Sequence, residues 1–226
     1  MKKKIIGIIA IILVAIFVAG IIYFEIEPKN TDINYAPADS QKTTDTTIRF
    51  NSNGKLKILH IADPHLDNDK HFDSSIWVIA NACDVEKPDL VVLTGDNTKP
   101  YETEEETKEL INALMNIFES RNIPVAVTFG NHDSEAGPMT RADIMEYYKT
   151  FSCVISADDS ENFKNCATFN IPVLASDSDE TKFNLWVFDS GDYDENGHYS
   201  CVKPDQIKWY NKTSDKLRED NNGETI

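Results

Sequence analysis

The alternation of apolar and polar segments along the chain predicts a parallel β-sheet with helical connections. Three short runs rich in Val, Ile and Leu, at 56–62, 90–94 and 125–129, have the length and composition of buried strands. Two amphipathic segments separate these runs. The order strand, helix, strand, helix, strand is the βαβαβ pattern of an α/β fold with right-handed crossovers.

The two connecting helices have recognisable start and stop signals. The first is expected to begin near Asp73 or the serine after it, and to end before Pro88. The second begins at a capping-box pattern, Thr103 with Glu106, and runs to about Arg121. Their apolar positions repeat at helical spacing, so each helix is expected to bury one face.

The second half of the chain predicts a different kind of sheet. The segments 154–155, 167–173 and 183–189 are typical of strands separated by polar turns, which indicates an antiparallel or mixed sheet. A short helix is expected over 139–148 and a final helix over 205–218. The register of the final helix places these residues near the core: Ile207, Tyr210 and Leu217, with Trp209 at the edge.

The amino-terminal pattern predicts a membrane anchor. Residues 5–24 are an uninterrupted run of apolar or small residues, about 30 Å long as a helix, which matches the hydrocarbon thickness of a bilayer. Three lysines precede the run, so residues 1–24 are expected to form a cytoplasmic end and a single-pass anchor in the cell membrane. The alternative, a cleaved signal peptide, is less favoured because such peptides have apolar regions of only about 7–15 residues. The polar residues 25–47 then form an extracytoplasmic linker, and 48–226 form an extracellular domain.

Composition narrows the range of partners. The formal net charge is −16. A surface this acidic repels nucleic acid, so no nucleic-acid partner is expected. The four cysteines have no CxxC spacing, which argues against a structural zinc site. Cys153 and Cys166 flank a turn-rich segment, where both a disulfide and two free buried thiols fit the sequence.

Candidate metal ligands follow each of the three predicted parallel strands. Asp63 and His65 follow the first strand, Asp96 follows the second, and Asn131 follows the third. The carboxyl ends of parallel strands share one edge of a sheet, where α/β proteins bind ligands. Carboxylate, imidazole and amide groups suit Mn²⁺, Fe or Zn²⁺, and a central carboxylate can bridge two ions.

The loop after the third strand also contains a candidate proton donor. His132 follows Asn131 directly, and the neighbouring Asp133 is expected to orient and charge the imidazole. A charged, oriented imidazole is what a general acid needs to protonate a leaving oxygen. His132 and Asp133 are therefore the candidate catalytic residues.

These motifs resemble those of the calcineurin-like metallophosphoesterases. The resemblance rests on Asp63-Pro64-His65, Gly95-Asp96-Asn97 and Gly130-Asn131-His132-Asp133. It extends through 188–193 and 202–210, which are similar to the branch related to purple acid phosphatases. It implies a metallophosphoesterase-like core of mixed β-sheets flanked by helices, with Asp63 and His65 on one metal, Asp96 bridging, Asn131 on the second metal, and His132 beside the phosphate.

The chain also departs from the family pattern. Lys99 stands where purple acid phosphatases have a tyrosine ligand, so no ferric-tyrosinate site is expected. The family completes its site with a later histidine and a Gly-His-x-His loop, and the sequence contains neither. Its histidines are His60, His65, His71, His132 and His198. We therefore expect a domain without its carboxyl-terminal part, an incomplete second metal site, and weak or no hydrolysis by this chain.

The resemblance leaves two functions open. The first is a membrane-anchored, extracytoplasmic phosphoesterase that hydrolyses a small phosphate ester by hydroxide activated between two metal ions. The second is a non-catalytic surface domain that binds phosphate or a partner protein, because the carboxyl-terminal ligands are missing.

Overall fold

The structure of the chain is a computed structural model, and it describes residues 47–99, 101–135, 137–156, 166–221 and 223. The expected anchor and most of the expected linker lie outside these ranges. Among the residues that the structure describes, no helix is both long and apolar enough to cross a bilayer.

The first sheet confirms the predicted βαβαβ core. Strands β2 (Ile58–Ile61), β3 (Leu90–Leu93) and β4 (Val125–Val127) are parallel and adjacent in that order. Helices α2 (Phe72–Glu86) and α3 (Glu104–Glu119) connect them. All four residues of β3 are buried, as the continuous apolar run predicts for the central strand of a covered parallel sheet.

The two connecting helices agree with prediction in place but not in every boundary. Helix α2 begins at Phe72 with His71 as its N-cap, slightly before the predicted start, and Asp73 lies in its first turn. An acidic side chain there still suits the positive end of the helix dipole. Helix α3 begins as predicted, with the Thr103 side chain accepting a hydrogen bond from the Glu106 N–H at 3.2 Å.

The second sheet is mixed, as expected, but it includes a strand that the sequence did not indicate. Its order is β1 (Ile48–Arg49), β5 (Phe169–Leu174) and β6 (Thr181–Val187), with β1 parallel to β5 and β5 antiparallel to β6. The expected strand at 154–155 is a single bridge between Val154 and Val125. The expected short helix is α4 (Arg141–Tyr148).

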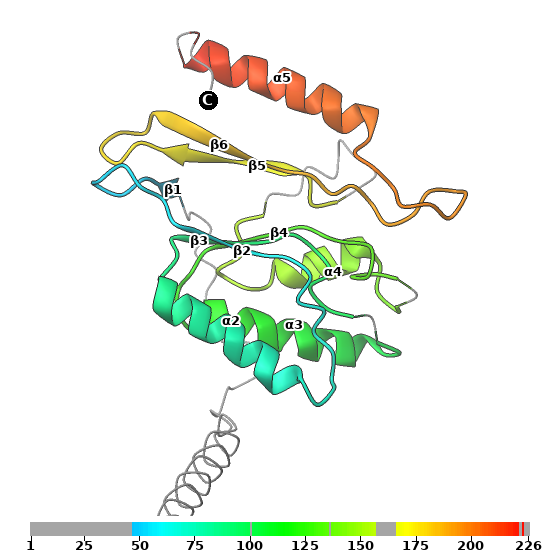
Figure 1. Ribbon diagram of the computed structural model, residues 1–226. Helices are drawn as coiled ribbons and strands as arrows, with labels where there is room; N and C mark the ends of the chain where they lie inside the picture. The colour runs from blue at the N-terminus through cyan, green and yellow to red at the C-terminus, as the bar shows by residue number, and fades with distance from the viewer. Residues whose placement is uncertain (1–46, 100, 136, 157–165, 222, 224–226) are drawn as a thin grey trace, which may run out of the picture. The chain divides into compact units, whose positions relative to one another are not determined.

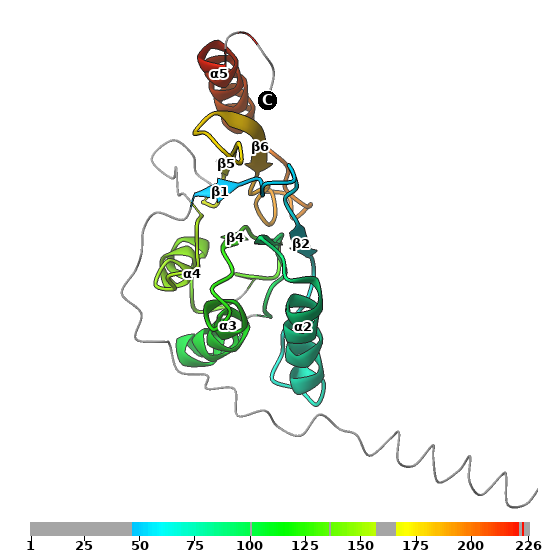
Figure 2. The same cartoon turned by 90° about the vertical axis from the view of Figure 1, so that its left-hand side faces the viewer.

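The described part of the chain is layered. Helices α2 and α3 lie side by side on one face of the β2–β3–β4 sheet (Figure 1), and the second sheet lies on the other face (Figure 2). Helix α5 (Pro204–Asp220) covers the outer side of β5 and β6. The observed fold is therefore the expected α/β class, with two sheets flanked by helices.

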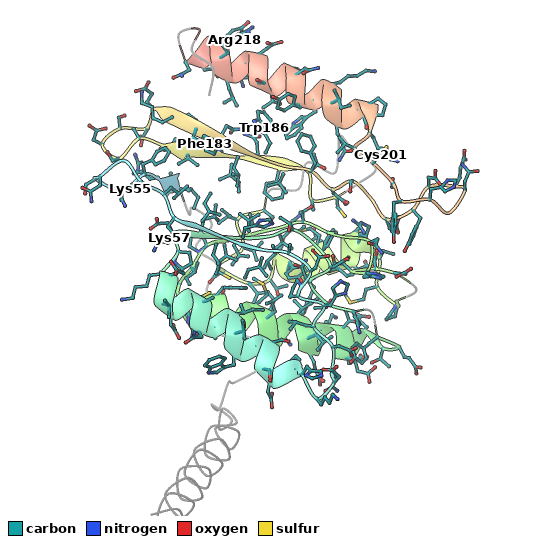
Figure 3. The ribbon with its side chains drawn as sticks, viewed as in Figure 1. Lys55, Lys57, Phe183, Trp186, Cys201 and Arg218 are labelled. Carbon is teal, nitrogen blue, oxygen red and sulfur yellow. The ribbon has the colours of Figure 1, made fainter. Side chains whose placement is uncertain are left out.

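Helix α5 is held by aromatic packing and by one buried amide. Trp186 of β6, labelled in Figure 3, packs edge-to-face against Trp209 and Tyr210 with ring centroids 5.4 and 4.6 Å away. The predicted buried face was wrong for Ile207, which is 49% exposed, and for Tyr210, which is 37% exposed. Among the described residues, the helix packs against the β5–β6 side (Figure 1), and Gln206 is its one fully buried residue.

The residue of α5 that is fully buried is polar. The Gln206 amide donates to the Thr168 hydroxyl at 2.6 Å and to the Asp189 carbonyl at 2.7 Å, and its oxygen accepts from the Lys203 N–H at 2.6 Å. These three bonds satisfy the amide inside the protein, which removes the usual cost of burying it.

The four cysteines are free thiols. Cys83, Cys153 and Cys166 are buried and Cys201 is exposed. Of the two alternatives that the sequence allowed for Cys153 and Cys166, the structure therefore has the pair of buried thiols.

Replacing the buried amide side chain of Gln206 is expected to lower the stability of the fold considerably. Gln206→Ala leaves the Asp189 carbonyl without its donor and creates a cavity, so we expect the free energy of unfolding to fall by about 2–3 kcal/mol. Urea unfolding followed by tryptophan fluorescence measures this change. The control is Lys208→Ala, an exposed position of the same helix, and equal effects of the two variants would contradict the assigned role of Gln206.

Candidate metal centre

The first two strand ends bring three candidate ligands into one cluster. Asp63, His65 and Asp96 each place a ligand atom within 4.8 Å of the other two. The His65 Nε2 lies 3.5 Å from Asp96 Oδ2 and 3.8 Å from Asp63 Oδ1. Two carboxylates and an imidazole converging at this range are a donor set that suits a divalent or trivalent metal ion.

The backbone of this cluster is strained. Asp63, His65 and Asp96 have positive φ angles of 54°, 44° and 49°. Such conformations cost roughly 1–3 kcal/mol each and persist where surrounding contacts impose them, often at functional sites. Here the two loops hydrogen-bond to each other: the Asp63 N–H donates to the Gly95 carbonyl at 3.1 Å, and the His65 N–H to the Asp96 carbonyl at 2.9 Å.

Two glycines allow the loops after β3 and β4 to touch backbone to backbone. A Cβ on Gly95 would lie 2.0 Å from the Gly130 nitrogen, and Gly95 also has a φ of +110°. A Cβ on Gly130 would lie 2.2 Å from Asp96 Oδ1. No side chain fits at either place, which explains why both motifs contain a glycine before the candidate ligand.

Asp133 joins these two loops through its carboxylate. It is buried and accepts hydrogen bonds from the backbone N–H groups of Asp96, Asn97 and Gly130 at 2.8 Å, and from Thr98 at 3.4 Å. Burial raises the pKa of this carboxyl to about 6, while the four N–H donors favour the ionised form and limit the rise.

The partner of His132 differs from the expected one. The His132 Nδ1 pairs with Glu135 Oε2, whereas the Asp133 carboxylate is directed to the backbone N–H groups. The backbone N–H of His132 donates to Asp96 Oδ1 at 2.8 Å. The centroid of the His132 ring lies 5.2 Å from that of the His65 ring. The structure therefore brings His132 to the candidate ligands Asp63, His65 and Asp96, with Glu135 in the orienting position that we assigned to Asp133.

The candidate ligand Asn131 is held by a residue from much later in the chain. Its amide nitrogen donates to the Tyr193 hydroxyl at 3.1 Å, and that hydroxyl donates to Glu135 Oε1 at 2.9 Å. Sequence reasoning missed both Glu135 and Tyr193 as site residues. For Tyr193 the available signal was the segment 188–193, which carried the family resemblance but had no assigned role.

An ion pair fastens the Tyr193 segment to the site. Arg141, at the start of α4, donates to the Gly130 carbonyl at 2.7 Å and pairs with the buried carboxylate of Asp189. Asp189 accepts the Gly191 N–H at 2.8 Å. Burial raises the pKa of Asp189, and the Arg141 guanidinium acts in the opposite direction. The backbone that leads to Tyr193 is therefore tied to the loop that holds Asn131.

The remaining polar residues singled out by the sequence have other partners. Lys99 forms an ion pair with Asp67 at 2.8 Å. The His60 ring lies 2.9 Å from the Thr94 hydroxyl, beside apolar residues of both sheets. His71 is the N-cap of α2, and His198 lies in the turn of a hairpin closed by a Tyr193–Tyr199 bridge.

Comparison with known proteins agrees with this geometry. A family model described as calcineurin-like phosphoesterase matches residues 56–225, and the chain belongs to that family. The chain is 29% identical over 213 residues to "Probable inactive purple acid phosphatase 29" of Arabidopsis thaliana, covering 82% of this chain and 53% of that protein.

Two further relatives extend the comparison. "Probable inactive purple acid phosphatase 28" of the same plant is 25% identical, covering 80% of this chain and 54% of that protein. "Phosphatase DCR2" of Saccharomyces cerevisiae is 26% identical, covering 69% of this chain and 31% of that protein. The expected relation to purple acid phosphatase-like proteins is confirmed, and the chain spans about half the length of the two plant relatives.

Removing the charge of Asp133 is expected to loosen both site loops. In Asp133→Asn an amide group faces four N–H donors, and its single oxygen cannot accept all of them. We expect the free energy of unfolding at pH 8 to fall by about 2–4 kcal/mol. Urea unfolding in the presence of EDTA measures the loss without a contribution from metal binding. Asp177→Asn, at an exposed position, is the matched control, and a loss no larger than that of the control would contradict this role.

Proposed function

We propose that this chain is part of a metal-dependent phosphoesterase that hydrolyses small phosphate esters. The observation that carries the proposal is the convergence of Asp63, His65 and Asp96 with the His132 imidazole beside them. Family membership supports the same class of reaction.

Asp63, His65 and Asp96 would hold one metal ion, and Asp96 with Asn131 would contribute to a second. The fit rests on the observed donor set, since carboxylate, imidazole and amide groups suit Mn²⁺, Fe or Zn²⁺. Such ions, when bound, stabilise charge on phosphoryl oxygens and lower the pKa of a coordinated water. The carboxylate of Asp96 also accepts the backbone N–H of His132, so the loop that carries the imidazole is tied to this candidate ligand.

His132 is the residue proposed to donate a proton to the leaving oxygen. Its Nδ1 is engaged by the Glu135 carboxylate, which leaves Nε2 as the ring nitrogen available to a substrate. A carboxylate on one ring nitrogen fixes the orientation of the imidazole. Positioned general acids of this kind contribute roughly 10²–10⁴-fold to a rate.

A second candidate function is phosphate binding without turnover. Two of the relatives described above carry the word "inactive" in their names, and this observation favours a non-catalytic role. Both candidate functions use the same metal cluster. They differ in whether His132 contributes to a chemical step.

Substitution of His132 separates the two functions. With Mn²⁺ and an aryl phosphate, we expect a low kcat for the full chain, abolished by EDTA, and reduced about 100-fold or more in His132→Ala with little change in KM. The control is His71→Ala, an exposed position whose side chain makes no capping hydrogen bond to α2. A chain that binds Mn²⁺ and phosphate but turns over no faster than His132→Ala would establish the non-catalytic function instead.

We also propose that residues 5–24 anchor the chain in the cell membrane, with the phosphoesterase domain outside. The support is the apolar run and the three lysines before it. The full chain is expected to remain with membranes after a carbonate wash. Ile12→Arg with Val14→Arg should shift it to the soluble fraction, because two charges at the centre of the run oppose insertion. Thr31→Arg with Asn34→Arg is the control, and equal behaviour of both double variants would refute the anchor.

A further inference from the structure

Two side chains, Tyr193 and Glu135, form a continuous hydrogen-bonded path between the candidate ligand Asn131 and the candidate acid His132. The Asn131 Nδ2 donates to the Tyr193 hydroxyl at 3.1 Å, and Tyr193 donates to Glu135 Oε1 at 2.9 Å. The other oxygen of Glu135 engages the His132 Nδ1. Glu135 therefore contacts both the group that would orient a metal ligand and the group that would move a proton.

The chemistry of these groups dictates the direction of each hydrogen bond. An ionised carboxylate only accepts, so the single hydrogen of the Tyr193 hydroxyl must be directed to Glu135. The hydroxyl oxygen then has only lone pairs for its second partner. That partner must be a donor, and the donor end of the Asn131 amide is its nitrogen.

This polarity decides which atom of Asn131 is free for a metal ion. An amide has one end that binds cations and one end that does not, and rotation by 180° exchanges them. With its nitrogen held by Tyr193, Asn131 presents Oδ1 away from Tyr193. We propose that Tyr193, polarised by Glu135, is a positioning residue that fixes the Asn131 amide in the orientation needed to bind a metal ion.

The surroundings of Tyr193 are built to hold its hydroxyl in place. Its ring stacks on that of Tyr199 with centroids 5.5 Å apart, and the two residues form an antiparallel bridge. The Asp194 carboxylate closes the turn between them by accepting the N–H groups of Asn196 and His198. Arg141 and Asp189 then join this segment to the Gly130 carbonyl, in the loop of Asn131.

The inference rests on the proposed metal-binding function of Asn131, and a metal titration tests it without any measurement of turnover. The full chain is titrated with Mn²⁺, and the free ion is followed by electron paramagnetic resonance. In Tyr193→Phe we expect the weaker class of Mn²⁺ site to lose affinity about 10–100-fold, the usual effect of removing a partner that orients a ligand. The site formed by Asp63, His65 and Asp96 should keep its affinity.

Two controls separate positioning from a general structural effect. Tyr199→Phe keeps the stacked rings and removes the other hydroxyl of the pair, so both affinities should match wild type. In an Asn131→Ala background, Tyr193→Phe should cause no further loss, because the amide that it orients is gone. A loss of the same size in that background would overturn the inference.

The orientation itself is measurable without metal. In ¹H–¹⁵N spectra of the apo chain, the Asn131 side-chain NH₂ should show slowed hydrogen exchange, and Tyr193→Phe should abolish that protection. Unchanged protection in Tyr193→Phe would overturn the inference. It would also be overturned if Asn131→Ala bound Mn²⁺ with the same affinities as the wild-type chain. Two Mn²⁺ sites with the expected Tyr193 dependence but no hydrolysis would uphold the inference and refute only the catalytic function.

Discussion

The buried carboxylate of Asp133 is the group on which the site depends most. It accepts hydrogen bonds from four backbone N–H groups of the loops after β3 and β4. The loop after β2 in turn donates backbone hydrogen bonds to the loop after β3. Three strand ends are thereby held in one geometry, although the backbone at Asp63, His65 and Asp96 is strained. The ionised acceptor and its donors offset a conformational cost that each loop would relieve if it were free.

A second set of contacts joins the later part of the chain to this centre. Arg141 links the Gly130 carbonyl to Asp189, and Gln206 links the Asp189 carbonyl to helix α5. Each of these polar groups is satisfied by another inside the protein, as buried polar groups must be. The α5 helix, the segment that leads to Tyr193 and the metal cluster are thus mechanically connected.

Local sequence determined the core architecture and the convergence of the candidate metal ligands. The three apolar runs and the two amphipathic segments have the periodicities of a βαβαβ unit, and parallel strands place their carboxyl ends together. Asp63, His65 and Asp96 therefore meet wherever that fold forms. The Thr103 cap was also predictable, because its hydroxyl accepts from an N–H group only three residues later in the sequence. Strand β1, with only two residues, carries no periodicity and could not be predicted.

Tertiary structure decided which neighbours the site residues have. Asp133 and Glu135 are both acidic and both close to His132, and the choice of Glu135 as its partner depends on where four backbone N–H groups converge. Tyr193 reaches Asn131 across 62 residues because an ion pair and a hairpin place it there. The buried face of α5 was likewise set by Trp186 and by the partners of Gln206, so Ile207 is exposed despite its apolar side chain. Periodicity reports which residues prefer burial, but long-range packing decides which surface covers them and which polar atoms converge.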